Sequence, residues 1–579
     1  MFVAHITHEA VEDMGGIGTV IAGLTTSKAY GKAVSRTVLV GPLFSTDKPT
    51  AELLGPGGKI LYSSLDEIYQ DNWREKFGPI ERTYGVGIIY GTRKIHEPYS
   101  GKAVDVEVLV FDLFAANEKR VNIFKASLYE KFDIPSDKFQ NVWDFEQYIR
   151  LAEPAIAALK ALGAMGERQT VLLSHEYMGM PTVLKAILDG NENTKTVFYA
   201  HEVASVRPIV ENTPGHDTTF YNVMKRAAEN GQNLEDIFPQ VVHNYKHPLV
   251  KAARHCDHVF AVGEFVRAEL EFLDSRFARG NIDLVYNGIP AASLTMRQKR
   301  ASQALLQEYA ANLFGQAPTW VFTHVARPVL SKAIWRDLRV LHELEPLLAS
   351  RGERAVYFML GTLGGGRRGR DVRHMERVYG WPVAHEQGYP DLCGGEEVVG
   401  EMCDAFNRTH EHSRAVLVNQ WGWSSKACGQ RMPAKMTIAD LRRGCDLEFG
   451  MSVYEPFGIS QLEPLSFGAL CVPSSVCGCV SFAAAAMRGE KFDNIIEGNF
   501  LHLPGEPGIE EILSLSTAER DAIEAAEGRR LAERIAQLLP RDKATQQRRI
   551  ETGQDLAHRM SWEHVVNEYF LPAIRRAGD

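Results

Sequence analysis

Two glutamates, Glu455 and Glu463, lie eight residues apart in the segment YEPFGISQLEPLSFGAL, which spans 454–470. Gly458 and Ile459 lie between them, where the pattern predicts the start of a helix. The N–H groups at a helix start bind phosphate, and a carboxylate within the helix could accept hydrogen bonds from two vicinal hydroxyls, as in a ribose. Glu455, on the preceding loop, could hold sugar hydroxyls near a reacting carbon. The flanking proline, glycine and small residues favour such a site over two unrelated carboxylates on a solvated face.

Two cations form a second candidate group. Arg327 and Lys332 lie five residues apart in THVARPVLSKAIWRD, directly after an expected strand. Cations on one loop suit a diphosphate, because they neutralise the charge that develops as the diphosphate leaves. The spacing therefore favours a diphosphate-binding loop, and the alternative is a pair of solvated loop cations.

The first half of the chain carries candidates at the ends of its expected strands. In EDMGGIGTV, Gly16 and Gly18 precede a helix and could let its N–H groups approach an anion. This turn lacks the GxGxxG spacing, so a tight loop without a ligand stays open as the alternative. His175 ends one strand in a setting where a structural role is expected, whereas His201 in YAHEVASVR is followed by Arg207 and could face a cleft with it.

The elements that must position these residues alternate between β-rich runs and amphipathic helices, which is typical of doubly wound α/β domains. We predict a Rossmann-like domain over 1–296, a polar helical link over 297–317 and a second Rossmann-like domain over 318–555. An insertion is expected near 364–413, and a terminal helix over 556–579 should pack back on the first domain. In such sheets ligands bind at the carboxyl ends of the strands, so we expect a central cleft between the domains.

Composition narrows the class of protein. The 579 residues carry 64 basic and 73 acidic side chains, a net charge of −9, which argues against nucleic acid as the main partner. No apolar run approaches the twenty residues of a membrane span, and the start MFVAHITHEA reads as a strand rather than a signal peptide. The eight cysteines contain no CxxC pair, so we expect reduced thiols, no metal site and a cytoplasmic protein.

Several of these segments together resemble a known family. YEPFGISQLEPLSFGALCVPSS is similar to the E-x7-E segment of retaining glycosyltransferases of the GT-B fold, most closely the glycogen and starch synthases. MGGIGTV, SHEY and YAHEVASVR look like the animal and fungal type of glycogen synthase. The resemblance implies an enzyme that extends an α-1,4-glucan from UDP-glucose or ADP-glucose, with retention of anomeric configuration and with neither metal nor cofactor.

The resemblance also implies roles for particular residues. Arg327 and Lys332 would hold the donor diphosphate and stabilise the leaving nucleotide. Glu455 would contact the donor sugar and polarise the reacting centre, Glu463 would bind the ribose, and His201 would present a polar group beside the sugar. The further predicted donor-binding residues are Gly16, Gly18, Gly458, Ile459 and Arg207.

Two alternatives to this function stay open. Asp13 occupies a position where the family usually has a lysine, and a carboxylate there would repel a diphosphate. Given Asp13, the chain could be a catalytically silent homologue that binds glucan or nucleotide sugar. Because the motifs are only moderately specific for the substrate, it could also be a retaining transferase that makes a disaccharide or small glucoside. The acceptor is expected to be a glucan or a small carbohydrate, and we expect a homo-oligomer that binds no membrane.

Overall fold

The structure is a computed structural model that describes residues 1–11, 15–44, 52–97, 101–166, 169–279 and 282–578. The chain divides into two units that exchange segments, and each is described by itself. Unit 1 consists of Met1–Ile209, Ala227–Gly288 and Trp562–Asp579. Unit 2 consists of Val210–Arg226 and Ile289–Ser561.

Unit 1 is built on a sheet with the strand order β10-β9-β8-β7-β1-β2-β6-β5-β3-β4. The strands from β10 to β6 are parallel, so their carboxyl ends share one edge of the sheet. Most of these strands are continuous apolar runs because helices cover both faces. The bounds are β1 Phe2–Ile6, β2 Arg36–Pro42, β6 Ala103–Asp112, β7 Thr170–His175, β8 Thr194–Ala200, β9 His258–Ala261 and β10 Ile282–Leu284.

Three further strands extend this sheet in the antiparallel sense, which the sequence analysis did not anticipate. β5 (Gly87–His96) pairs with β6 along ten residues, and β3 (Lys59–Ser63) and β4 (Ile68–Tyr69) follow it. The connection from His96 to Ala103 is too short for a crossover helix, so β6 has to return beside β5 in the opposite direction.

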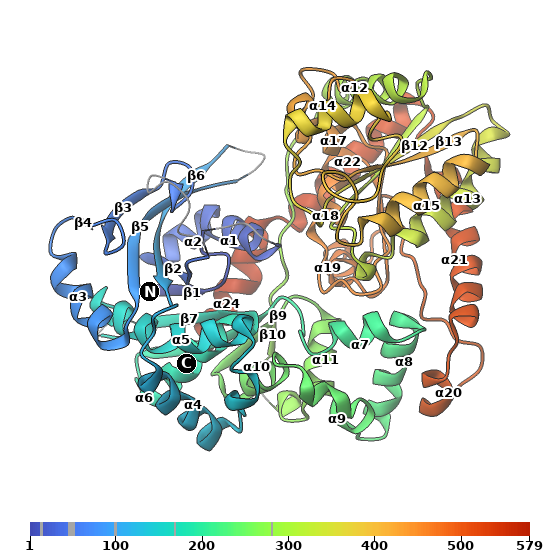
Figure 1. Ribbon diagram of the computed structural model, residues 1–579. Helices are drawn as coiled ribbons and strands as arrows, with labels where there is room; N and C mark the ends of the chain where they lie inside the picture. The colour runs from blue at the N-terminus through green and yellow to red at the C-terminus, as the bar shows by residue number, and fades with distance from the viewer. Residues whose placement is uncertain (12–14, 45–51, 98–100, 167–168, 280–281, 579) are drawn as a thin grey trace. The chain divides into compact units, whose positions relative to one another are not determined.

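The C-terminal segment completes unit 1, as the sequence predicted. It forms α23 (Trp562–Val565), a π-helical turn η8 (Val566–Phe570) and α24 (Leu571–Gly578), which lies beside the blue N-terminal elements in Figure 1. The Trp562 ring fills the space in front of Gly23 and Gly288, where a Cβ atom would lie 2.1 Å and 2.6 Å from Trp562 atoms. Only glycine at these two positions admits the indole ring.

Unit 2 contains a five-stranded parallel sheet with the order β13-β12-β11-β14-β15. Its strands are β11 Trp320–Val325, β12 Ala355–Leu360, β13 Ser413–Val418, β14 Leu447–Gly450 and β15 Leu470–Pro473. Helix α13 (Ile334–Ala349) and the long α21 (Thr517–Leu538) pack against each other. Apolar side chains from both helices and from the sheet strands join one core cluster. This is the second doubly wound domain that the alternating pattern predicted.

Residues Val210–Arg226 come from the first half of the sequence but belong to unit 2. Asp217 of this excursion forms a two-point ion pair with Arg336 of α13 at 2.7 and 3.0 Å. Arg336 also donates to Glu524 of α21 at 2.8 Å, and all three side chains are at most 1% exposed. The buried Arg336 guanidinium, which lies between two carboxylates, therefore holds the segment Val210–Arg226 against the rest of unit 2.

Two stretches differ from the expected organisation. The stretch 297–317, expected to be a link, holds most of helix α12 (Met296–Phe314), whose Leu306 and Tyr309 are buried in a core cluster of unit 2. The stretch 364–413, expected to be an insertion, ends in α15 (Glu396–Thr409), which packs against β13 and joins the core through Cys403 and Phe406. Because parallel β12 and β13 require a crossover, this helix is part of the domain itself.

Among the described residues, no helix has both the length and the apolar character needed to cross a membrane.

Candidate active site

In unit 2 the candidate site is built on the loop that follows β14. Glu455 lies on this loop, and the one-turn helix α18 (Ile459–Leu462) begins after Gly458. Gly458 has φ +91°, and a Cβ atom there would lie 2.5 Å from the Gln461 side chain. A glycine is therefore required at position 458. The turn that it forms directs the Glu455 and Gln461 side chains towards each other.

The Glu455 carboxylate is held by two side chains. Lys332, the last residue of the 3-10 turn η6 (Leu330–Lys332), forms an ion pair with it, and Gln461 donates to it at 3.3 Å. The two charged side chains are only 17% and 14% exposed, so their attraction is less screened than on an open surface. The structure thus brings together two predicted site residues that lie 123 positions apart in the sequence.

Arg327 lies on the same loop as Lys332, two residues after β11, and its side chain is exposed. Within the described part of the chain, its guanidinium lies within 4 Å of no carboxylate. No described carboxylate neutralises this cation, whereas Lys332 is already paired with Glu455.

Glu463 is oriented by a buried arginine. Arg442, 1% exposed, lies 2.8 Å from Glu463 and 2.9 Å from Glu448 of β14, and it donates to the Ser460 carbonyl. The expected helix is correct at its start but not in its continuation, because Glu463 opens the 3-10 helix η7 (Glu463–Phe467). Pro464 has no N–H to continue the α-helical hydrogen bonding.

In unit 1 a chain of buried imidazoles runs to the candidate residue His201. The Tyr30 hydroxyl lies 3.0 Å from His5 Nε2, His5 Nδ1 lies 2.8 Å from His175 Nε2, and His175 Nδ1 lies 2.8 Å from His201 Nε2. These residues come from α2 (Lys28–Ala33) and from β1, β7 and the end of β8. Neighbouring parallel strands thus place the three rings in register at one edge of the sheet.

Burial keeps these imidazoles neutral. It lowers the pKa of His5 and of His201 to about 3, and it lowers the pKa of His175 well below its usual value. A neutral imidazole has one donor and one acceptor nitrogen, so each ring in the chain dictates the tautomer of the next. The proton position on His201 is therefore coupled to Tyr30, far inside the unit.

The glycine turn after β1 is occupied by a carboxylate of the protein. The Gly18 N–H donates to Glu9 at 2.7 Å, and a Cβ atom on Gly15 would lie 2.9 Å from a Glu9 oxygen. Gly16 is exposed at the N-cap of α1 (Ile17–Thr26). The donor that Gly18 was predicted to offer to a phosphate is thus already used, and Asp13 lies outside the described residues.

Arg207 is paired with a neighbour from the same strand end. It donates to Glu202 at 2.7 Å, and the Glu202 N–H donates to Glu176 at 2.5 Å. Glu176 has the strained φ of +61° and is buried, which raises the pKa of its carboxyl well above the usual value. The predicted pair of His201 and Arg207 thus lies in a larger acidic and imidazole cluster at this edge.

Sequence reasoning missed the residues that orient the predicted ones. These are Gln461 and Arg442 in unit 2 and Glu9, Glu176 and His5 in unit 1. Glu176 directly follows His175 in SHEY, so the motif itself carried a signal. Gln461 lies between Glu455 and Glu463 in the segment 454–470, so its position was a signal as well. Arg442, Glu9 and His5 lie outside the predicted motifs, and only the fold brings them to the site.

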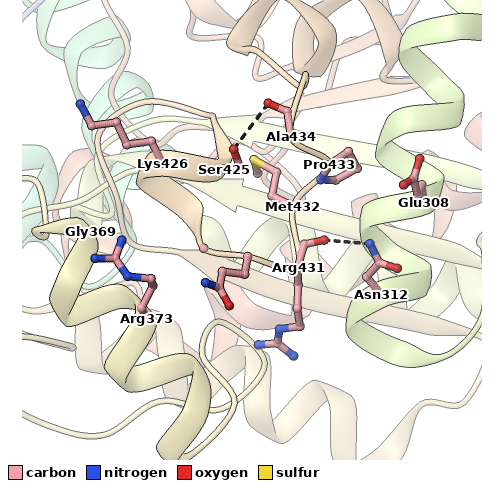
Figure 2. A pocket seen from close by; sticks show the side chains of 12 residues that line it. Glu308, Asn312, Gly369, Arg373, Ser425, Lys426, Arg431, Met432, Pro433 and Ala434 are labelled. Carbon is pink, nitrogen blue, oxygen red and sulfur yellow. Dashed lines mark hydrogen bonds between the residues drawn. The ribbon is translucent and has the colours of Figure 1, made fainter.

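A surface pocket of about 490 Å³ lies elsewhere in unit 2. Figure 2 shows Arg373 and Lys426 on one side of it and Glu308 on the other. Arg431 on its wall donates to the Gly380 carbonyl, and the Arg431 carbonyl accepts from Asn312. None of the predicted site residues lines this pocket.

No family model matches the chain, and no curated protein matches its sequence. Its structure is similar to the catalytic domain of starch synthase IV from Arabidopsis thaliana bound to ADP and acarbose, with a TM-score of 0.52, 13% identity and 100% of both chains covered. An α,α-trehalose-phosphate synthase from Burkholderia vietnamiensis gives a TM-score of 0.48 at 11% identity over 99% of both chains. A sucrose-phosphate synthase from Thermosynechococcus elongatus gives 0.48 at 12%, over 100% of this chain and 98% of that one.

The likeness to starch synthase IV confirms the predicted fold class, GT-B, with two Rossmann-like α/β units. At 13% identity it establishes the fold and not the activity. The closeness to animal and fungal glycogen synthases, and the cleft between the domains, stay predictions.

Proposed function

We propose that the protein is a retaining glucosyltransferase that extends an α-1,4-glucan from a nucleotide-diphosphate glucose donor. The observation that carries the proposal is the partly buried ion pair between Lys332, which follows β11, and Glu455, which follows β14; Gln461 donates to the same carboxylate. A cation and a carboxylate at the carboxyl end of a Rossmann-like sheet suit a diphosphate and the sugar attached to it.

In this proposal the residues of unit 2 act chiefly through charge. Lys332 and Arg327 receive the negative charge of the departing diphosphate, and the ion pair keeps the Lys332 ammonium in place before the donor binds. Glu455 contacts the donor sugar, and Glu463, oriented by Arg442, binds the ribose. The leaving phosphate takes the proton of the acceptor hydroxyl, so no separate general base is needed.

In unit 1 the proposal gives His201 a contact with the donor sugar. Because the imidazole is neutral, it can donate or accept one hydrogen bond but brings no charge beside the reacting carbon. The occupied glycine turn supports a donor diphosphate held by unit 2, since the Glu9 carboxylate would repel a second anion at Gly18.

Transfer of labelled glucose from UDP-glucose and ADP-glucose tests the proposal. Label in a polymer, with the α-anomer by NMR, is expected. Removing one charged group that stabilises the transition state costs about 2.7–4 kcal/mol, so Lys332→Met and Glu455→Gln should lower turnover about 10²–10³-fold. Lys435→Met, which removes an exposed lysine of the same unit, is the matched control.

The possible outcomes distinguish between the functions that the sequence left open. Label confined to a small product would identify the small-acceptor transferase. Donor binding in a thermal-shift assay without transfer or hydrolysis would identify a silent homologue. Near-normal turnover of both Lys332→Met and Glu455→Gln would refute the assigned site.

A further inference from the structure

An aromatic pair lies uncovered at the same sheet edge as His201. The Phe114 ring is 68% exposed and stacks on Trp143, which is 39% exposed, with centroids 4.8 Å apart and planes 4° from parallel. Phe114 follows β6 by two residues, and Trp143 begins α5 (Trp143–Ala161). Large apolar rings are usually buried, so such an exposed pair requires an explanation.

Hydrogen bonds fix the backbone that carries the exposed Phe114 ring. The Arg150 guanidinium donates to the carbonyls of Leu113 and Phe114 at 3.3 and 3.1 Å, and Asp112 accepts from the Phe114 N–H at 3.2 Å. Arg150 is itself fixed by Glu146 at 3.1 Å. The ring therefore presents a preorganised flat face, which lowers the entropy cost of binding a ligand.

Polar aromatic side chains continue from this pair along the edge. Asp144, next to Trp143, accepts from the hydroxyls of Tyr177 and Tyr245 at 2.6 Å each, and Lys246 lies 4.8 Å from the centre of the Tyr177 ring. Trp143 and Asp144 lie on α5 and Tyr177 lies on α6 (Glu176–Asp189), whereas Tyr245 and Lys246 directly precede α10 (His247–Ala252). Helix α6 packs against both α5 and α10 (Figure 1). We call this strip the aromatic rim: Phe114, Trp143, Asp144, Tyr177, Tyr245 and Lys246.

The sheet gives the length of the rim. β6 is separated from β7 by three strand spacings and from β8 by four, in the order β8-β7-β1-β2-β6. At about 4.8 Å per spacing, Phe114 lies roughly 14–19 Å from the strand ends that carry His175 and His201. A single hexose stacked on Phe114 cannot reach His201, whereas a chain of several sugars can.

We infer that the aromatic rim binds an oligosaccharide chain of the α-1,4-glucan type, and this inference rests on the proposed function. Exposed aromatic faces receive the apolar C–H face of a pyranose, while the partly exposed Asp144, Tyr245 and Lys246 offer hydrogen bonds to its hydroxyls. A rim of this length favours a polymeric acceptor over a disaccharide-forming one.

Binding of maltoheptaose, measured by calorimetry and by Trp fluorescence, tests the inference. Phe114→Ala and Trp143→Ala should each raise the Kd at least tenfold and raise the KM for maltoheptaose in the transfer assay. Tyr129→Ala, which removes a ring 63% exposed on α4 (Glu118–Phe132), is the matched control and should behave as the unaltered protein. Because the Phe114 ring is mostly exposed and the Trp143 ring is partly exposed, circular dichroism should show folded variants.

Several outcomes would overturn the inference. Maltoheptaose affinity equal in Phe114→Ala, Tyr129→Ala and the unaltered protein would do so, and so would equal affinity for cellohexaose, a β-1,4-linked chain. Hydrolysis of the nucleotide sugar, measured separately without acceptor, tests the proposed function. A protein that binds maltoheptaose through the aromatic rim but hydrolyses no donor would refute the enzyme assignment and retain the carbohydrate site.

Discussion

Asp446 allows a quantitative prediction about the strand that carries the Glu455 loop. It precedes β14 and is 2% exposed, and its carboxylate accepts from the Val321 N–H at 2.9 Å and from Gln303 at 2.9 and 3.0 Å. These bonds tie α12, β11 and β14 together. Burial, only partly offset by Lys299 and these hydrogen bonds, raises the pKa of Asp446 from 3.8 to about 6.

The sign and size of the effect follow from this shift. Because the folded-state pKa is higher than the unfolded one, the folded protein binds more protons between pH 3.8 and 6, so stability falls as the pH rises through this window. The whole shift of about 2.2 units corresponds to about 3 kcal/mol. Between pH 5.0 and 7.5 the free energy of unfolding should fall by the part of this amount that corresponds to about one pKa unit, which is about 1.4 kcal/mol.

Hydrogen exchange measured by mass spectrometry is a suitable assay, because a chain of two units does not unfold in a single step. Peptides containing β11 and β14 should be compared in the unaltered protein and in Asp446→Asn at each pH, so that intrinsic exchange rates cancel. Relative to the variant, the opening constant of the unaltered protein should rise about tenfold from pH 5.0 to 7.5.

Asp404→Asn removes an exposed carboxylate of the same unit and is the matched control. Its exchange should follow the unaltered protein at every pH. If the opening constants of the unaltered protein and of Asp446→Asn kept the same ratio at every pH, the reasoning would be refuted. Such a result would mean that Asp446 binds no additional proton in the folded state.

Three further predictions concern buried networks. Arg336→Met should lower the free energy of unfolding of unit 2 by about 3–5 kcal/mol in urea, because Asp217 and Glu524 lose their cation; a loss below about 1 kcal/mol would contradict this. Burial raises the pKa of Glu396, but hydrogen bonds, first from Arg367, outweigh it and lower the pKa to about 2. Acid titration should therefore destabilise unit 2 as the pH falls from 4.5 towards 2, and Glu396→Gln should flatten that slope. His5→Leu should turn the single His201 tautomer in ¹⁵N NMR spectra into a mixture, and an unchanged spectrum would refute the coupling.

The periodicity of the sequence predicted the parallel strands well, because both faces of these strands are buried and their apolar runs are continuous. RTVLVG and RAVYFMLG, for example, correspond to β2 and β12 within one residue at each end. The antiparallel strands β3 and β4 gave a weaker signal, since they are short and partly exposed. Alternation alone does not distinguish a crossover helix from an insertion, which is why α15 was assigned to an insertion.

The candidate site was predictable only where its residues form local motifs. Glu455 and Gly458 share a segment, and Lys332 lies next to a strand, so sequence spacing pointed to them. Arg442 is one of many arginines, and only the fold places it between Glu448 and Glu463. Glu9 escaped attention for the same reason, although it changes the expected role of the glycine turn.

The Trp562 indole that fills the space before Gly23 and Gly288 has a consequence for synthesis. A ribosome adds about 5–20 residues per second, so roughly 14–55 seconds separate Gly288 from Trp562. Throughout that interval the nascent first unit has an unfilled apolar slot, and it is exposed to aggregation. Folding of unit 1 is therefore completed only after Trp562 has been synthesised, and a stop codon before Trp562 should leave a product that chaperones retain.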